Sequence, residues 1–313
     1  MLRSHRHDAF GAEPAQWREP APRTLSSGGL AAPLGGGGGA AAVKLSELGE
    51  LGLLAELERR GLARGIANDA AELADGLVVT QDALVEDVHF RLDWISWRDL
   101  GWRAAAVNLS DLAASGAAPE ALIVSVALPP QTAVEDVLEL YEGIVETQVP
   151  VVGGDTSRAE RVTLSVTALG CSQRVPGRGG ARPGDRLVVT GPLGGAGAAF
   201  REQQYVRPPL RLEEGRELAA HATAMLDLSD GLAVDAGHIA ARSRCRLVVD
   251  LDRLPLAPEA LLEDLGFGED YELLAAVAEP GRFHEIGRCE EGEGVELLHR
   301  GEPVKLGGWD HFG

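Results

Sequence analysis

The chain has 313 residues, and 45% of them are apolar, enough to form the core of one large or two medium domains. Its formal net charge of −19 disfavours nucleic acid and anionic membranes as partners. The longest apolar runs, such as 122–128, have the length of a strand and fall short of the roughly 20 residues that a membrane span needs. We therefore expect a soluble protein, in which an anionic ligand would require a divalent metal as a bridge.

The first 42 residues differ in composition from the rest of the chain. The segment SSGGLAAPLGGGGGAAA is rich in Gly, Ala and Pro and offers little apolar surface to bury. It also lacks the continuous apolar centre of a secretory signal. We expect residues 1–42 to be a disordered tail or an over-long start, rather than a targeting segment, and the folded part to begin near Val43.

The predicted elements alternate between helices and strands. A helix capped by Ser46 and ended by Gly61 opens the folded part, and the strand 76–90 follows. We then expect a helix from Asp99 to Val107 with a second one after Ser110. The remaining elements of this half are a strand at 120–129, a helix at 133–147 and strands at 149–157 and 161–170.

The segment 173–185, rich in Gly, Pro and Arg, predicts a domain boundary. After it we expect a strand at 186–190, a glycine loop at 191–197, helices near 212–221 and 231–242, a strand at 245–251, and further strands and turns. The chain is thus a mixed α/β protein with a tail (1–42) and two domains, 43–175 and 176–313. Each domain carries one Leu-Ser-Asp sequence.

Six aspartates lie at or just past the end of an apolar segment, beside small residues: Asp69, Asp82, Asp111, Asp155, Asp227 and Asp230. Ligands of α/β proteins gather at strand ends, and Mg²⁺ is held by carboxylates together with substrate phosphates. An aspartate before a helix is also a common N-cap, an alternative open for Asp111 and Asp230 and preferred for Asp99 and Asp264. Capping gives no reason for two similar Leu-Ser-Asp neighbourhoods, which favours metal binding.

Other phosphate-binding signals are weak. No GxxxxGK[ST] motif is present, and residues 191–197 are more typical of a turn before a helix than of a dinucleotide loop. Arg178 could contact phosphate or remain a solvated linker charge. His89 closes a strand, where a single histidine is usually structural. The three cysteines are far apart in sequence, which disfavours a zinc or disulfide site and fits the cytoplasm.

The sequence resembles the thiamine-monophosphate kinases through a series of motifs in the family's order. They are TQDALVEDVHF, NLSDLAASGAAP, VVGGDTSR, GARPGD, DLSDGLAVDAGHIA, GEDYELL and the closing GGWDHF. The resemblance covers about Val43 to Phe312. It implies the two-domain fold of aminoimidazole ribonucleotide synthetase-like enzymes and a homodimer whose N-terminal sheets pair across the interface.

The resemblance also implies a reaction: the γ-phosphoryl group of ATP passes directly to thiamine monophosphate and gives thiamine diphosphate, with several Mg²⁺ ions and no protein base. The implied metal positions are Asp69, Thr80, Gln81, Asp82, Asp111, Asp155, Asp227 and Asp230. The implied nucleotide contacts are Tyr141, Gly154, Asp155, Arg178 and Ser229. The implied thiamine-phosphate contacts are His89, Glu269 and Trp309.

The sequence departs from the family pattern at several positions. Asn68 and Gln81 replace an aspartate and a threonine, and Asp87 replaces a glycine. The segments between Tyr141 and Gly153 and before Gly268 are shorter than usual. We expect a working enzyme with altered metal affinity, because the aspartates assigned as ligands remain. Two alternatives stay open: another ATP-dependent enzyme of the superfamily, or a degenerate protein that binds nucleotide or thiamine phosphate without turnover.

Overall fold

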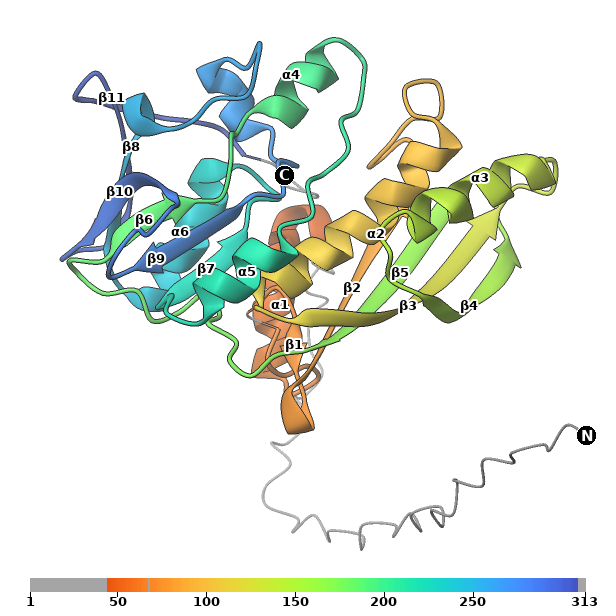
Figure 1. Cartoon of the computed structure of the whole chain (residues 1–313), viewed down its shortest axis with the longest axis horizontal. Coiled ribbons are helices and arrows are strands. Elements are labelled where there is room, and N and C mark those ends of the chain that lie inside the picture. Colours follow the sequence, from red (N-terminus) through yellow and green to blue (C-terminus); the bar gives the residue numbers. More distant parts are fainter. Residues whose placement is uncertain (1–43, 67, 309–313) are drawn as a thin grey trace, which may run out of the picture. The chain divides into compact units, whose positions relative to one another are not determined.

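The computed structural model describes residues 44–66 and 68–308, in which helices pack on two β-sheets (Figure 1). The first sheet has the strand order β1-β2-β5-β3-β4; the β3–β4 pair is parallel, and the other three pairs are antiparallel. Its strands are β1 (Ala71–Glu72), β2 (Leu77–Val85), β3 (Ala118–Leu128), β4 (Val151–Arg158) and β5 (Thr163–Cys171).

Two helices cover one face of this sheet. Helix α2 (Trp97–Ala114) packs on β2, β3 and β5, and α3 (Val134–Val145) packs on α2. Because side chains alternate between faces along a strand, Val124 and Val166 are buried beneath the helices. Ile123, their neighbour on the other face, is 38% exposed. The described helices therefore leave the second face of this sheet uncovered.

The second sheet has the strand order β12-β11-β8-β10-β6-β9-β7. Its strands are β6 (Arg186–Val189), β7 (Ala224–Asp227), β8 (Arg246–Asp250), β9 (Leu273–Val277), β10 (His284–Glu290), β11 (Gly294–His299) and β12 (Glu302–Val304). The associated helices are α4 (Gly195–Arg201), α5 (Leu212–Ala219) and α6 (Leu232–Ser243). Short 3₁₀ turns lie at η1 (Ala74–Gly76), η2 (Leu251–Arg253) and η3 (Leu262–Gly266).

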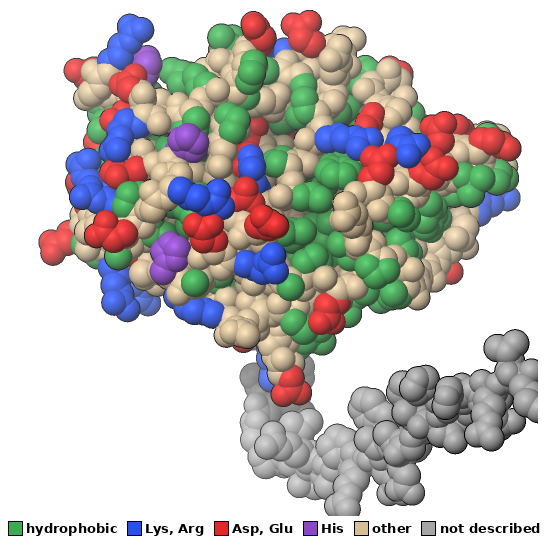
Figure 2. Space-filling model, in the orientation of Figure 1, with side chains coloured by type: hydrophobic (Ala, Val, Ile, Leu, Met, Phe, Trp, Pro, Cys, Tyr) green, Lys and Arg blue, Asp and Glu red, His purple; other side chains and the backbone are tan. Residues whose placement is uncertain are grey.

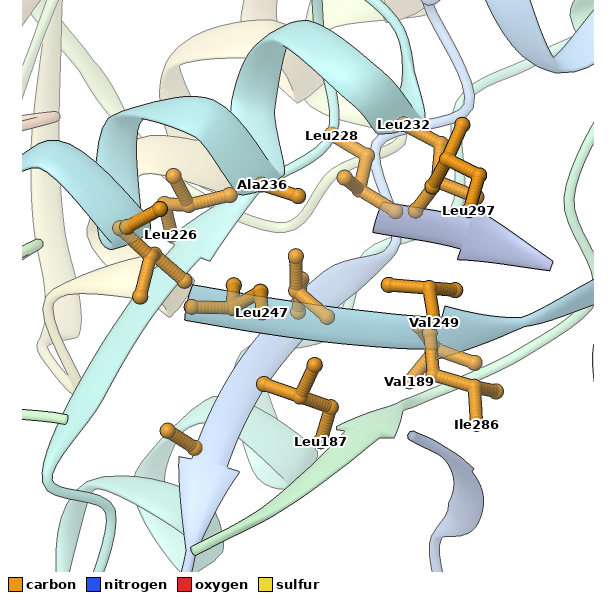
Figure 3. Close-up of a cluster of buried hydrophobic side chains, with 14 of the residues drawn as sticks. Leu187, Val189, Leu226, Leu228, Leu232, Ala236, Leu247, Val249, Ile286 and Leu297 are labelled. Carbon is orange, nitrogen blue, oxygen red and sulfur yellow. The ribbon is translucent and has the colours of Figure 1, made fainter. Parts of the chain in front are cut away.

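The core of the second half lies between this sheet and α6 (Figure 3). Leu187, Val189, Leu247 and Val249 come from the strands, and Leu232 comes from the helix. Their alternation in the strands directs every second side chain to the helix-covered face. This packing fixes the end of β7, where the second Leu-Ser-Asp sequence begins.

The mixed α/β class is confirmed, and two of the predicted helix boundaries are wrong. Helix α2 runs without a break through Asn108, where we expected a helix end, because the Asn108 side chain is satisfied by hydrogen bonds with the Asp82 N–H and the Ala104 carbonyl oxygen. Helix α1 (Leu45–Arg59) begins before Ser46, with Lys44 as its N-cap. None of the described helices combines the length and apolar character that crossing a membrane requires.

Candidate active site

The two Leu-Ser-Asp sequences lie against each other where the two halves of the chain meet. Ser110, on α2, donates a hydrogen bond to Asp227 at the end of β7. The neighbouring Asn108 accepts the backbone N–H of Asp82 at 3.0 Å. The first motif therefore reaches both β2 and β7 from one helix, and the carboxylates of the two halves share one site.

Three carboxylates form the centre of this site. Ligand oxygens of Asp69, Asp111 and Asp227 all lie within 4.8 Å of one another. The hydroxyl of Thr80 donates to Asp111, and it also lies 3.2 Å from the carbonyl oxygen of Asp69. Asp69 precedes β1, Asp111 lies inside α2 and Asp227 ends β7, so three separate elements supply the group.

Burial raises the pKa values of these carboxyls. It is the main cause of the raised pKa of Asp69, and it raises the pKa of Asp227 to about 7, with the charge of Asp69 adding to the effect. Burial and the charges of Asp82 and Asp227 hold the pKa of Asp111 well above its usual range. Burial also raises the pKa of Asp82, to which the charge of Asp230 contributes. Crowded carboxylates of this kind fit a hard divalent cation, which relieves their mutual repulsion.

Arg178 supplies the positive charge beside the group. Its Nη2 donates to Oδ1 of Asp69 at 2.5 Å, and its Nε donates to the same oxygen at 3.0 Å. Its backbone N–H donates to Oδ1 of Asn68 at 3.1 Å. The guanidinium is thus fixed next to the carboxylates, where it can also meet the phosphate of a bound anion.

A second group of possible ligands follows β7. Asp230, Asp235 and His238 bring a carboxylate or imidazole atom within 4.8 Å of one another. Buried Asp235 accepts the backbone N–H groups of Asp230 and Gly231, each at 3.1 Å. Burial lowers the pKa of His238, so the neutral ring predominates at neutral pH. The turn that carries Ser229 and Asp230 is thereby fixed from within α6.

Two of the three residues expected on the thiamine-phosphate side, His89 and Glu269, share Arg103 as a partner. Arg103, on α2, forms an ion pair with Glu269 and donates to the carbonyl oxygen of His89 at 3.2 Å. Nδ1 of His89 accepts the Val85 N–H at 3.0 Å, so the neutral ring carries its proton on Nε2. The Glu269 N–H donates to the carbonyl oxygen of Ser229 at 2.8 Å. This contact joins Glu269 to the turn of Asp230.

Trp309 lies outside the described residues, but the two glycines before it are placed beside the site. A side chain at Gly308 would come within 2.1 Å of Val234, and 3.2 Å from the carbonyl oxygen of Asp230. Gly307 and Gly308 line a cavity of about 380 Å³ together with Phe200 and Phe267. The centroids of these two rings are 4.6 Å apart. Gly307 and Gly308 therefore lie close to the Asp230 turn and to these two aromatic rings.

The expectation that the side chain of Gln81 joins the metal group is wrong. Side chains alternate along β2, so Gln81 points away from the face that presents Thr80 and Asp82. It lies on the uncovered face, where its Oε1 accepts the Thr167 hydroxyl at 3.0 Å.

Asp155 and Gly154 lie on the edge strand β4, apart from the carboxylate group of the same chain. The strand register places Gly154 in one row with Asp82, with β5 and β3 between them, which separates them by about 14 Å. Tyr141 lies on α3 and packs against the core of the first sheet. These three residues are not brought into the group formed by Asp69, Asp111 and Asp227.

None of the four aspartates considered as helix N-caps occupies an N-cap position. Asp111 lies in the last turns of α2, so it caps no helix start, and the N-cap of α6 is Gly231 instead of Asp230. Asp99 and Asp264 do act at helix starts, but as the third helical residue. Asp99 accepts the Ser96 hydroxyl at 2.6 Å, and Asp264 accepts the Leu261 N–H at 2.7 Å.

We did not predict three residues of the site from the sequence: Arg103, Asp235 and His238. One signal was available for Arg103, because it precedes Ser110 by seven residues and so lies on the same face of an Ala-rich helix. For Asp235, the signal was its place in the first turn of the helix after the motif. No signal short of the fold links Arg103 to Glu269, which lies 166 positions further along the chain.

Comparison with known proteins identifies the family of the chain. The family models for the N- and C-terminal domains of AIR synthase related proteins match residues 67–172 and 182–299. The thiamine-monophosphate kinase of Aquifex aeolicus is 34% identical over 310 residues, covering 86% of this chain and all of the relative. That of Mycobacterium tuberculosis is 33% identical over 310 residues, covering 86% of this chain and 93% of the relative.

Solved structures agree with the sequence relatives. The structure of AaThiL complexed with AMPPCP and TMP superposes with a TM-score of 0.80 at 33% identity, covering 87% of this chain and all of that one. The two-domain AIR synthase-type fold is thus confirmed. The chain belongs to the thiamine-monophosphate kinase family of AIR synthase related proteins.

Proposed function

We propose that this protein transfers the γ-phosphoryl group of ATP to thiamine monophosphate, giving thiamine diphosphate and ADP. The observation that carries the proposal is the group of buried carboxylates of Asp69, Asp111 and Asp227, with Arg178 beside it. The names of the relatives support this substrate, and the complex of AaThiL with an ATP analogue and TMP supports the pairing of nucleotide and acceptor.

Mg²⁺ is the metal that best fits the oxygen-rich group. Asp69, Asp82, Asp111, Asp227 and Asp230 would hold it, with the hydroxyl of Thr80 hydrogen-bonded among them. When bound, Mg²⁺ neutralises the phosphate oxygens and thereby supports phosphoryl transfer. The raised pKa values of the carboxyls are a second argument, since the free group stores repulsion that a cation relieves.

In the proposed reaction, a phosphate oxygen of thiamine monophosphate forms a bond to the γ-phosphorus, while the bond between that phosphorus and the bridging oxygen of ADP breaks. The acceptor oxygen is already anionic, so no protein base is required. The protein positions both phosphates and neutralises charge. Arg178 and Ser229 are proposed on the ATP side, and His89, Glu269 and Trp309 on the acceptor side.

Tyr141, Gly154 and Asp155 are proposed as nucleotide contacts only together with a second copy of the chain. Asp155 lies on an exposed edge strand, far from the carboxylate group of its own chain, and Val152 on the same strand is 64% exposed. Hydrophobic side chains also gather over the region of the first sheet in Figure 2. A homodimer through this sheet would cover the exposed face, and light scattering of the purified protein tests it.

We place the protein in the cytoplasm, and its three free cysteines, Cys171, Cys245 and Cys289, support a reducing compartment.

The domain limits 43–175 and 176–313 also remain predictions, which limited proteolysis can test.

A product assay tests the function directly. Purified protein is incubated with ATP, MgCl₂ and thiamine monophosphate, and thiamine diphosphate and ADP are followed by mass-resolved chromatography. We expect thiamine diphosphate and ADP to form in equal amounts. Neither should form in the presence of EDTA or with the Asp230→Ala variant. Binding of both ligands without turnover in excess Mg²⁺ would overturn the kinase assignment and favour a binding protein. Turnover of ATP with a different acceptor would favour a sister enzyme.

A further inference from the structure

Arg103 is a buried cation in the middle of the Ala-rich helix α2. Its side chain is 3% exposed, and its guanidinium reaches three segments far apart in the chain. One nitrogen, Nη2, donates both to Glu269 and to the carbonyl oxygen of His89. The guanidinium carbon also lies 4.9 Å from the ring centroid of Tyr205. A single side chain thus joins both described residues of the proposed acceptor side.

Burying a guanidinium is unfavourable unless its N–H groups are paired. Among the described residues, however, Nε of Arg103 is buried and has no hydrogen-bond partner. A residue that served only to stabilise the fold would be expected to have all its donors paired. Arg103 instead forms an ion pair with Glu269 and so orients its carboxylate.

The backbone of Glu269 makes this orientation necessary. Glu269 has φ 59°, a left-handed conformation that few residues other than glycine adopt. Its N–H donates to the carbonyl oxygen of Ser229, so the turn of Ser229 and Asp230 fixes its main chain, and Arg103 fixes its side chain. Strained residues of this kind persist where surrounding contacts hold them and often occur at functional sites.

We propose that Arg103 is a positioning residue for the acceptor: it holds Glu269 and His89 in one geometry and so sets the affinity for thiamine monophosphate, not for ATP. This inference rests on the proposed function of the same site. The ion pair with Arg103 holds the Glu269 carboxylate in one orientation.

The test compares Arg103→Met and Arg103→Lys with wild type and with Arg211→Met. Arg211 is a matched control, because its Nη2 pairs with buried Glu272 at 2.5 Å outside the acceptor side. For each variant, calorimetry gives the Kd for thiamine monophosphate and for a non-hydrolysable ATP analogue in MgCl₂, and kinetics give the two KM values. A thermal unfolding curve establishes that each variant folds.

We expect Arg103→Met to raise the Kd and KM for thiamine monophosphate by about ten- to a hundredfold, the loss of a hydrogen bond to a charged group. The constants for the nucleotide should change by less than about twofold, and Arg103→Lys should lie between Met and wild type. Arg211→Met should lower the midpoint of thermal unfolding, but it should not change the constants for one substrate more than those for the other. An equal change for both substrates in Arg103→Met, or none, would overturn the inference.

Glu269→Gln keeps the side-chain shape and decides the question if Arg103→Met does not fold. It should weaken acceptor binding, and in a folded Arg103→Lys/Glu269→Gln pair the two effects should be less than additive, because both act on one contact. Additive effects would count against the inference. Wild type that binds thiamine monophosphate without turnover would refute the proposed function alone. Wild type with turnover but unchanged variant affinities would refute the inference alone.

Discussion

The hydroxyl of Ser110 lies 2.6 Å from Oδ2 of Asp227 and donates a hydrogen bond to it across 117 residues of sequence. Ser110 belongs to the first Leu-Ser-Asp sequence, near the end of α2, and Asp227 directly precedes the second one, at the end of β7. The hydrogen bond lowers the pKa of Asp227, against the larger effect of burial. It therefore favours the ionised carboxylate that a divalent cation requires.

Ser110→Ala should weaken metal binding at neutral pH. Without the hydroxyl, the pKa of Asp227 rises further above about 7, and more of the carboxyl is protonated. We expect the Mg²⁺ concentration for half-maximal activity to rise about three- to tenfold at pH 7, with a smaller rise at pH 8.5. Thr147→Ala removes another buried hydroxyl, which donates to Ile144, and serves as the control. An equal Mg²⁺ requirement in both variants would contradict the expectation.

The stability of the protein should depend on pH and Mg²⁺ together. Because the pKa of Asp227 is raised in the folded state, the folded state binds more protons than the unfolded state between about pH 4 and 7. The contribution of the protonated Asp227 carboxyl to stability is therefore lost as the pH rises through about 7, because the carboxylate is then charged and lies close to other carboxylates. Mg²⁺ should restore it, since the metal binds the ionised form.

Thermal unfolding with MgCl₂ and with EDTA measures this linkage. We expect the stabilisation by Mg²⁺ to be several degrees larger at pH 8 than at pH 5.5, by mass action on the folded state. In Asp227→Asn, the stabilisation by Mg²⁺ should differ much less between pH 8 and pH 5.5. A Mg²⁺ effect that is equal at both pH values in wild type would show that the carboxyls are ionised throughout.

Local sequence pattern predicted the strands β2 to β5 and the class of the fold, because alternation and apolar length are properties of neighbouring residues. It failed at Asn108, where a polar sequence inside α2 looked like a helix end. Asn108 accepts the Asp82 N–H, and its own amide donates to the carbonyl oxygen of Ala104, so the polar group is satisfied without ending the helix. Tertiary contacts decided that boundary.

The candidate site was also predicted only in part, because residue type and local context can be read from the sequence but tertiary packing cannot. Asp69, Asp111 and Asp227 could be chosen by residue type and context, and the structure places them together. Gln81 was placed wrongly because the alternation of β2 was not applied to it. The contact between Arg103 and Glu269 depends on how the two halves of the chain pack, and no local pattern encodes that packing.

Gly154→Ala should destabilise the protein strongly. Gly154 has φ 152°, and a Cβ there would come within 1.8 Å of the carbonyl oxygen of Val124. Strand β4 would have to shift away from β3, so we expect a loss of about 3 kcal/mol or more in the free energy of unfolding. Gly153→Ala is the matched control, because no atom lies within 4 Å of its Cβ position. Urea unfolding should leave that variant within about 1 kcal/mol of wild type, and equal losses would refute the steric argument.

Asn68→Asp should strengthen metal binding. Asn68 accepts the Arg178 N–H through Oδ1, and an aspartate can accept the same hydrogen bond while adding a negative charge beside Asp69. Because the position is exposed, the added charge acts through a high dielectric, and we expect the Mg²⁺ requirement to fall by about two- to fivefold at low salt. The gain should shrink as ionic strength rises, which a Mg²⁺ titration of the initial rate at two salt concentrations measures.

Two further variants separate charge from hydrogen bonding at this position. Gln81→Glu adds the same charge on the uncovered face of β2, beside Thr167, and should leave the Mg²⁺ requirement within about twofold of wild type. Asn68→Ala removes the acceptor for Arg178 without adding charge, and should raise the requirement. If Asn68→Asp and Gln81→Glu changed the Mg²⁺ requirement equally, net charge and not the position beside Asp69 would be the cause.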